Sequence, residues 1–261
     1  MEISFKGKTA LVTGAAGAMG KGIAADYCAG GASVFITDIS PAGVEATVRE
    51  LQKAGPCQGL AGDIATEGDV IKIVAAAQKA FDGKIDILIN VAGIVGQGKV
   101  EELQVEEWDK MFAVNCRGAF LLIKHVVPLM KQNQYGKIIN FSSKSGKTGS
   151  ALMSHYSAAK AAIIGLTQSL AYELADYKIT VNCICPGITE NTGVWRHVAA
   201  GYIQNLKLPR AEVVRKFSAK VPLKRLASIK DVVAITCFLG SEGSDYMTGQ
   251  AINITGGREM H

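Results

Sequence analysis

Two side chains with the potential for acid–base chemistry stand four residues apart. Tyr156 and Lys160 would share one face of a helix at this spacing. A tyrosine phenol has a pKa near ~10 and is a poor base at neutral pH. A nearby ammonium group stabilises the phenolate and lowers that pKa. The pair is therefore a candidate for moving a proton to or from an alcohol, although the spacing alone is common on helix surfaces.

A glycine-rich turn, Thr13–Gly20, follows a short β-branched run and opens a helical pattern. Glycines there permit a tight bend and let a pyrophosphate approach backbone N–H groups. The phosphates would then lie at a helix N-terminus, where the helix dipole favours negative charge. By itself the turn is also compatible with a ligand-free strand–helix connection. The predicted contacts in it are Gly14, Gly17, Ala18, Met19 and Gly20.

An acid at the end of the next predicted strand supports the dinucleotide interpretation. Asp38 lies 18 residues after Gly20 (38 − 20), close to the ~20 expected for a carboxylate that binds a ribose. Such a carboxylate would repel a 2′-phosphate. Neither Gly17 nor Ile39 supplies a basic side chain that would reverse this preference, so the sequence predicts NAD rather than NADP as the cofactor.

Short β-branched runs alternate with amphipathic stretches of helix length along the whole chain, which indicates βαβ units and a parallel sheet. We therefore predict one α/β domain over residues 1–261, a Rossmann-type doubly wound parallel sheet of about seven strands with helices on both faces. The predicted strands are Thr9–Thr13, Ser33–Thr37, Gln58–Ala61, Ile85–Asn90, Lys137–Phe141, Thr180–Ile184 and Ala251–Ile254. The predicted helices are Gly20–Ala29, Ala42–Ala54, Glu67–Phe81, Val105–Lys131, Tyr156–Ala175 and Ile229–Leu239.

One connection, at about 188–222, is too long for an ordinary turn between a strand and a helix. It carries the aromatic residues Trp195 and Phe217. We predict that it forms a substrate lid with short helices of its own.

Several short motifs occur in a fixed order: Thr13–Gly20, Asp38, Asp63, Asn90-Val91-Ala92-Gly93, Asn115, Ser142-Ser143, Tyr156-x-x-x-Lys160 and Pro186-Gly187. Together they resemble the short-chain dehydrogenase/reductase family, over essentially the whole chain. The resemblance implies that Ser143 donates a hydrogen bond to the substrate oxygen. It implies further that Lys160 binds the nicotinamide ribose and tunes Tyr156, and that Asn115 holds a water in a proton relay. The other cofactor contacts that it implies are Ile39, Asp63, Ile64, Asn90, Ala92, Gly93, Pro186, Gly187 and Thr189.

The chain departs from the family pattern at three places. Ala18 stands where a glycine is usual, Val91 replaces an asparagine, and the threonine that follows Pro-Gly is displaced. Thr189 and Thr192 both remain candidates for that threonine.

The substrate is suggested by a resemblance to the polyol dehydrogenases of the sorbitol-6-phosphate type. Lys144, His155 and Trp195 are the candidate substrate contacts. Lys144 is equally compatible with a solvated loop lysine, and Trp195 with packing of the lid onto the body of the domain.

Composition and residue spacing argue against a nucleic-acid-binding, membrane-spanning or metal-binding protein. The net charge of +5 is spread along the chain instead of forming the basic stripe of a nucleic-acid-binding protein. No uninterrupted apolar run reaches the ~18 residues of a membrane span, so we expect no membrane partner. The four histidines and six cysteines show no metal-ligand spacing, so no metal is expected. An N-terminus without a charged and then apolar leader predicts a cytoplasmic location.

We therefore interpret the chain as an NAD(H)-dependent enzyme that interconverts a secondary alcohol, such as a polyol or sugar derivative, and a ketone. The alternatives are a ketoreductase of acyl, steroid or cyclic ketones and, in a different class, a non-catalytic NAD-binding protein. The stretch Tyr156–Ala175 is too apolar on several sides for a monomer surface. The family resemblance implies that it packs with Val105–Lys131 against a second subunit, which predicts a homotetramer.

Overall fold

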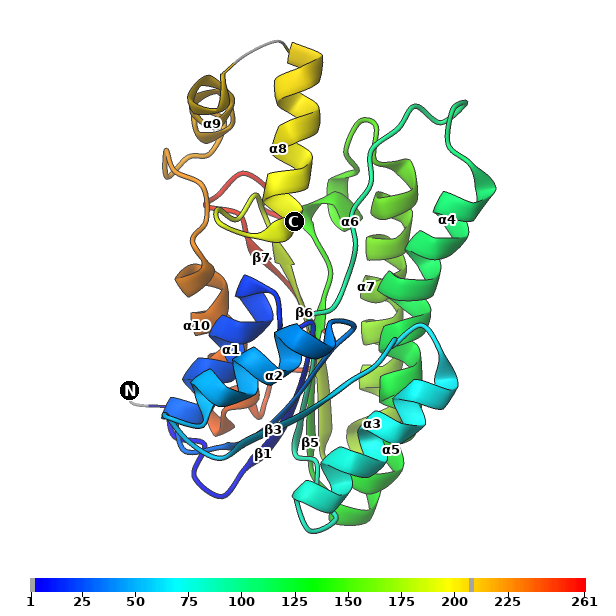
Figure 1. Cartoon of the computed structure of the whole chain (residues 1–261), viewed down its shortest axis with the longest axis vertical. Coiled ribbons are helices and arrows are strands. Elements are labelled where there is room, and N and C mark those ends of the chain that lie inside the picture. The colour runs from blue at the N-terminus through cyan, green and yellow to red at the C-terminus, as the bar shows by residue number, and fades with distance from the viewer. Residues whose placement is uncertain (1–2, 207–208) are drawn as a thin grey trace.

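A computed structural model describes residues 3–206 and 209–261, without the side chains of 198, 200–202 and 204–206. A parallel sheet of seven strands forms its centre (Figure 1). The strand order is β3-β2-β1-β4-β5-β6-β7, so the chain winds outward in one direction from β1 and then in the other. The strands are β1 (Thr9–Thr13), β2 (Ser33–Asp38), β3 (Cys57–Ala61), β4 (Ile87–Asn90), β5 (Gly136–Phe141), β6 (Ile179–Pro186) and β7 (Ala251–Ile254).

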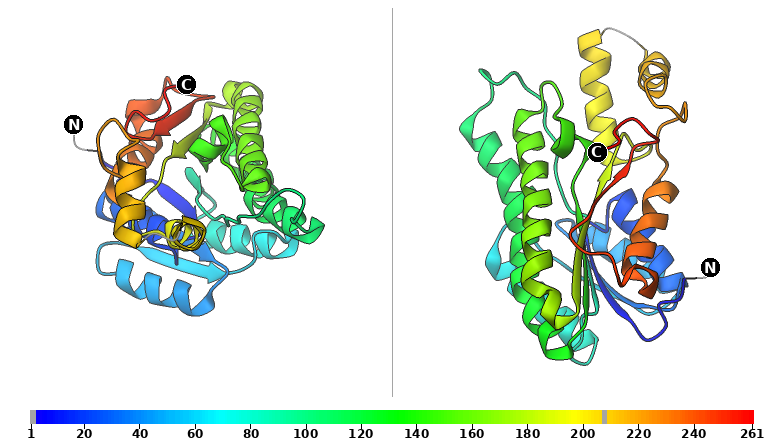
Figure 2. Two further views of the ribbon diagram at one scale, coloured as in Figure 1. Left: turned by 90° about the horizontal axis from the view of Figure 1, so that it is seen from above. Right: turned by 180° about the vertical axis from the view of Figure 1, so that it is seen from behind.

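Helices cover both faces of this sheet, as the sequence predicts (Figure 2). One face packs against α1 (Ala18–Ala29), α2 (Pro41–Leu51) and α10 (Ile229–Gly240). The other packs against α3 (Glu67–Ala80), α5 (Gly118–Asn133) and α7 (Ser154–Leu174). Neighbouring residues of β1 bury their side chains on opposite faces, Val12 in one core and Leu11 in the other. This explains why the strands are continuously apolar instead of alternating.

The prediction of one regular helix over Val105–Lys131 is wrong. It consists of α4 (Val105–Phe112), a π-helical turn η1 (Ala113–Arg117) and α5. A π turn inserts a residue into the helical ladder and often marks a functional site. The hydrophobic period changes little across one such turn, so the sequence pattern does not reveal it. The other predicted helices and strands differ from the observed bounds by at most three residues at either end.

The helical stretch Val105–Asn133 is, by length and composition, long and apolar enough to cross a membrane, with a mean hydropathy of 1.3 over its most apolar window. Core helices of water-soluble proteins pass the same test. Leu121, Leu122, Val126 and Met130 of α5 lie in the core beside the sheet, which accounts for much of this apolar content.

The long connection after β6 forms two helices, α8 (Gly193–Leu206) and α9 (Arg210–Ser218), beyond the carboxyl end of the sheet (Figure 1). Thr192 caps α8: its hydroxyl accepts a hydrogen bond from the Trp195 N–H at 3.0 Å and donates one to the Thr189 carbonyl. Trp195 packs edge-on against Phe217 of α9, with ring centroids 6.1 Å apart. The aromatic residues thus hold the two helices together.

Candidate active site

The glycines of the first turn bring backbone close to the start of α1. Gly14 has a φ of +65°, and a Cβ there would lie 2.8 Å from the Ala92 Cα. Gly17 is the N-cap of α1, which has no side-chain cap and no acidic residue in its first turn, where Ala18 and Met19 lie. No capping side chain therefore competes with an anion for the N–H groups at this helix end, which fits the binding of a pyrophosphate. A Cβ at Gly20 would collide with the Gly14 carbonyl, so Gly20 permits the tight turn.

Asp38 at the end of β2 is held beside this turn. Its carboxylate accepts hydrogen bonds from the Ala16 N–H and the Ser40 N–H, both at 3.1 Å. Ile39 next to it is 71% exposed and so offers an apolar surface at the edge of the turn. The geometry fits a ribose and an adenine ring next to the pyrophosphate position.

Asp63 and Ile64 are placed differently from each other. The Asp63 carboxylate accepts a hydrogen bond from the Ala65 N–H at 2.9 Å in the loop after β3. The Ile64 side chain is buried against Gly118, where a Cβ would lie 2.7 Å from the Ile64 Cδ1. Any contact of Ile64 with an adenine would therefore come from its backbone.

The loop after β4 lies across from the first turn. The Asn90 side chain donates to Asn140 at 2.9 Å, and the Ala92 N–H donates to the Thr13 hydroxyl at 3.0 Å. A Cβ at Gly93 would lie 2.5 Å from the Asn115 Oδ1 and 3.3 Å from the Lys160 Nζ. Only glycine leaves these two side chains room next to the backbone.

Asn115 owes its position to the π turn. Its side-chain NH₂ donates to the Ile94 and Met111 carbonyls at 3.0 and 3.1 Å, and its Oδ1 accepts from the Ile94 N–H at 3.2 Å. The residue is 2% exposed. These bonds tie the loop after β4 to the helix and fix the amide next to Lys160.

Lys160 lies 4% exposed on α7, and its Nζ donates to the Phe141 carbonyl at 2.8 Å. Burial lowers the pKa of its ammonium group to about 8, because the charged form loses its hydration. The charge of Lys160 is therefore easily modulated near neutral pH.

Tyr156 and Ser143 lie together in the wall of the same cavity, as predicted. Burial raises the pKa of the Tyr156 phenol, and a hydrogen bond with the Ser143 side chain opposes that rise. Desolvation is the larger of these two influences on the phenol pKa. The Lys160 Nζ lies 5.8 Å from the centre of the Tyr156 ring.

Ser143 is positioned by a short helix that the sequence analysis missed, α6 (Lys144–Thr148). Ser143 is its N-cap, and the Ser143 Oγ accepts a hydrogen bond from the Ser145 N–H at 3.1 Å. Gly146 allows α6 to lie against α7, since a Cβ there would be 2.7 Å from the Lys160 carbonyl carbon. A helix of five residues is too short to show a hydrophobic period, so the sequence of this segment did not predict it.

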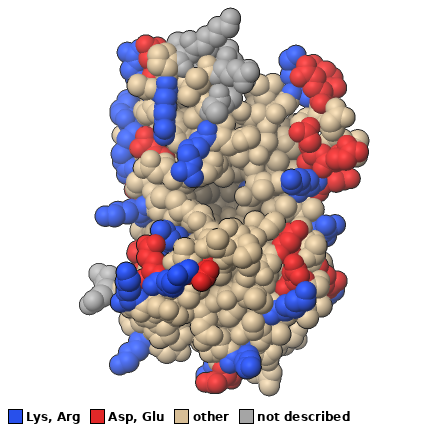
Figure 3. All heavy atoms as spheres, viewed as in Figure 1, with Lys and Arg blue, Asp and Glu red and all other residues tan. Residues whose placement is uncertain are grey.

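These residues enclose a cavity of roughly 200 Å³ beside the lid. Figure 3 shows a hollow at the middle of one face of the molecule, with Lys and Arg side chains near its rim. Trp195 and Phe217 of the lid line one side of the cavity. The predicted residues in the cavity wall are Met19, Gly93, Asn115, Ser143, Lys144, Tyr156, Lys160, Pro186, Gly187, Thr189 and Trp195.

Of the candidate substrate contacts, Lys144 and Trp195 line the cavity, whereas His155 is not among its described lining residues. His155 is 2% exposed and packs against Gly96, where a Cβ would lie 2.6 Å from the His155 Nε2. Burial lowers the pKa of its imidazole. His155 and Tyr156 point in different directions because successive side chains of an α-helix are turned by about 100° from one another.

Both candidate threonines, Thr189 and Thr192, line the cavity. Sequence reasoning missed Arg258 in the wall, because nothing in the spacing of the C-terminal segment links it to Ser143. The described residues contain no group of three or more His, Cys, Asp or Glu side chains placed to hold a metal ion.

A doubly wound parallel sheet, with a glycine turn at a helix N-terminus and a cavity lined by Ser143, Tyr156 and Lys160, defines a nucleotide-binding class of protein. The profile of a family described as "Enoyl-(Acyl carrier protein) reductase" matches residues 14–259. Sorbitol dehydrogenase of Cereibacter sphaeroides is 36% identical over 255 residues, which cover 97% of this chain and 98% of that protein. The chain belongs to the short-chain dehydrogenase/reductase family.

Solved structures agree with this assignment. An NAD⁺-bound xylitol dehydrogenase is 29% identical, with a TM-score of 0.92, over 97% of this chain and 99% of that one. A single-site variant of the actinorhodin polyketide ketoreductase, solved with NADPH, is 32% identical, with a TM-score of 0.93, over 97% and 98% of the two chains. The similar proteins thus include both polyol dehydrogenases and ketoreductases.

Proposed function

We propose that this protein is an NAD(H)-dependent oxidoreductase that interconverts a secondary alcohol and a ketone, with a polyol or sugar derivative as substrate. The observation that carries the proposal is the meeting of Ser143, Tyr156, Lys160 and Asn115 in one cavity wall. A nicotinamide dinucleotide bound at the Gly14–Gly20 turn would supply the hydride acceptor or donor.

The side chains then divide the work on the substrate. Ser143 donates a hydrogen bond to the substrate oxygen and so stabilises negative charge as it develops there. Tyr156 takes the hydroxyl proton during oxidation and returns it during reduction. Because burial raises the pKa of the phenol, Tyr156 needs a nearby positive charge to act as a base. Lys160 and an oxidised nicotinamide would supply that charge.

Substitution of Tyr156 tests this mechanism. Tyr156→Phe keeps the ring but removes the proton-transfer group, so turnover on the best alcohol found in a polyol screen should fall by ~10²–10⁴-fold. The affinity for NADH, measured by fluorescence, should change little. Near-native turnover in this variant would contradict the mechanism. An absence of NADH turnover on a broad panel of alcohols and ketones would favour the non-catalytic alternative.

The cofactor preference is carried by Asp38. Its carboxylate is fixed by the Ala16 and Ser40 N–H groups and would repel a 2′-phosphate. We expect NADH to bind more tightly than NADPH. In Asp38→Ala, the dissociation constant of NADPH divided by that of NADH should fall by about tenfold or more. Equal affinities in the wild-type protein would contradict the preference. They would not by themselves favour the second candidate, a ketoreductase, since one similar ketoreductase was solved with NADPH and another with NADH.

A further inference from the structure

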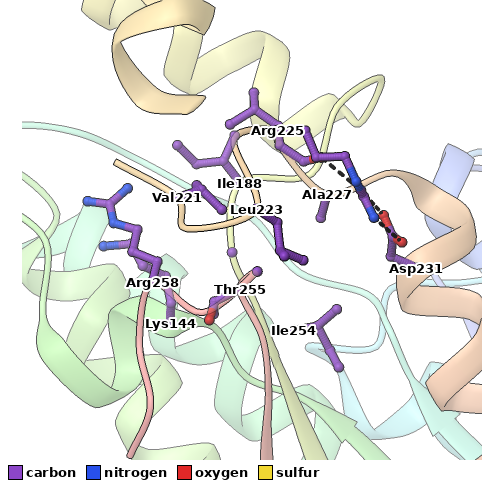
Figure 4. Close-up of a pocket in the computed structure, with 13 residues that line it drawn as sticks. Lys144, Ile188, Val221, Leu223, Arg225, Ala227, Asp231, Ile254, Thr255 and Arg258 are labelled. Atoms are coloured by element: carbon purple, nitrogen blue, oxygen red, sulfur yellow. Dashed lines mark hydrogen bonds and ion pairs between the residues drawn. The ribbon is translucent and has the colours of Figure 1, made fainter. Parts of the chain in front are cut away.

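Figure 4 shows the residues that line a second cavity, of roughly 230 Å³, which shares part of its wall with the catalytic one. It is bounded by the C-terminal segment after β7 and by the chain that follows α9. Four residues belong to the walls of both cavities: Lys144, Gly187, Ile188 and Arg258. Two of the four are cations. We call Lys144 and Arg258 together the basic wall.

The positive charge of the basic wall exceeds the negative charge that faces it. The Lys144 Nζ lies 4.0 Å from the Glu259 Oε1 and donates a hydrogen bond to the Ser150 hydroxyl at 3.0 Å. The Arg258 Nε lies 3.3 Å from the same Glu259 oxygen. Two cations therefore share one carboxylate. Burial, followed by the charge of Arg258, lowers the pKa of the Lys144 ammonium group, whereas Glu259 raises it.

Two other cations of the region form hydrogen bonds of their own. Arg225, in the wall of the second cavity, forms two hydrogen bonds with Asp231 at 2.6 and 2.9 Å, drawn as dashed lines in Figure 4. The Lys147 Nζ donates to the Ala251 carbonyl at 2.6 Å. The charge of Lys220 adds to that of Arg258, because it also lowers the pKa of the Lys144 ammonium group. The two side chains of the basic wall are 15% and 25% exposed and so remain open to a ligand.

The basic wall adjoins the reacting groups. Lys144 follows Ser143 directly in the chain and shares the cavity with Tyr156. Partly desolvated cations without a full counter-charge favour an anion, and arginine and lysine bind carboxylates and phosphates with charge-assisted hydrogen bonds. A substrate whose alcohol lies at Ser143 and Tyr156 would place an anionic group, a few bonds away, at the basic wall.

We propose that the substrate carries an anionic group, a carboxylate or a phosphate ester, which Lys144 and Arg258 bind while the alcohol reacts. This inference rests on the proposed function, whose substrate class it narrows from polyols in general to acidic polyol derivatives. The basic wall determines specificity through binding and takes no part in proton or hydride transfer.

The test compares three six-carbon probes with NAD⁺: sorbitol, gluconate and sorbitol 6-phosphate. The kcat/KM of the wild-type protein should be about tenfold or more higher for at least one anionic probe than for sorbitol. Arg258→Met and Lys144→Met should raise the KM for that anionic probe and so remove most of this advantage over sorbitol. Arg258→Lys should recover part of it. Lys230→Met, which removes an exposed charge from α10, is the matched control and should change nothing.

The two anionic probes distinguish a carboxylate from a phosphate ester. Equal kcat/KM for all three probes, or an anionic advantage that survives in both methionine variants, would overturn the inference and leave the proposed function intact. An NADH affinity equal to that of the wild type would show that the variants are folded.

A calorimetric titration of the NADH-bound protein with gluconate and with inorganic phosphate gives a readout without turnover. If neither the probes nor the broad panel of alcohols and ketones is turned over, but an anion binds and Arg258→Met weakens that binding tenfold or more, the anion site stands and the proposed function is wrong. If nothing is turned over and neither anion binds, both are wrong.

Discussion

A single buried lysine sets the balance between activity and stability at the active site. The folded-state pKa of Lys160, about 8, lies below its ordinary value of 10.5, so folding disfavours the ammonium form. Its charge therefore costs stability below about pH 8, and the cost disappears as the pH rises towards 10.5. Lys160→Met should raise the free energy of unfolding at pH 7 by on the order of 1–3 kcal/mol, after the loss of the hydrogen bond to Phe141, and abolish turnover.

Denaturant unfolding at pH 7 and pH 9.5 measures this effect. The stability advantage of the variant should shrink at the higher pH, because wild-type Lys160 is then mostly neutral in the folded protein. Lys79→Met, at an exposed site on α3, should shift the free energy of unfolding by less than about 0.5 kcal/mol at either pH. A Lys160→Met variant that is less stable than the wild type at pH 7 would contradict the prediction.

The contact between α6 and α7 positions Ser143 relative to Tyr156. Gly146→Ala would place a methyl group 2.7 Å from the Lys160 carbonyl carbon and 2.8 Å from the Ser142 Oγ. The two helices must then separate, which should cost about 1–3 kcal/mol of stability. Because small displacements of catalytic groups are costly, kcat should fall by about tenfold or more. Thermal unfolding and steady-state kinetics on the same preparation test both effects.

Gly68 of α3 is the matched control, because no heavy atom lies within 4 Å of the position of an added Cβ. Gly68→Ala should stabilise the protein by about 0.5–1 kcal/mol through helix propensity and leave kcat unchanged. Equal effects of the two substitutions would show that the α6–α7 contact does not govern the site.

Three helices on the same face of the sheet each carry an exposed aromatic residue, and we propose that these residues form subunit contacts of a homotetramer. Trp108 of α4, Phe120 of α5 and Tyr172 of α7 are 42%, 47% and 89% exposed. Grouped apolar surface of this kind is typical of protein interfaces. Phe120→Asp should yield a smaller species in size-exclusion chromatography with light scattering. Ile71→Asp on α3, with a similar exposure of 49%, should leave the assembly unchanged. A monomeric wild-type protein would refute the proposal.

Local sequence was sufficient for much of the fold and part of the site. The alternation of apolar runs and amphipathic stretches predicted every strand of the sheet, because strand and helix periods are properties of neighbouring residues. The same holds for the pairing of Tyr156 with Lys160 on α7 and for the glycine turn at the start of α1, where spacing alone fixes which groups share a face or a helix end. The order of the motifs then indicated the family.

Tertiary structure decided what depends on contacts between distant segments. The π turn fixes Asn115 through bonds to Ile94, and the close contact at Gly146 positions Ser143, but neither changes the hydrophobic period that sequence analysis reads. Arg258 reaches the cavity only because β7 pairs with β6 and returns the chain to its carboxyl edge. The spacing of neighbouring residues thus determined the pairing of Tyr156 with Lys160. The order of the strands determined the proposed anion site, because it brings residues 144 and 258 together in one wall.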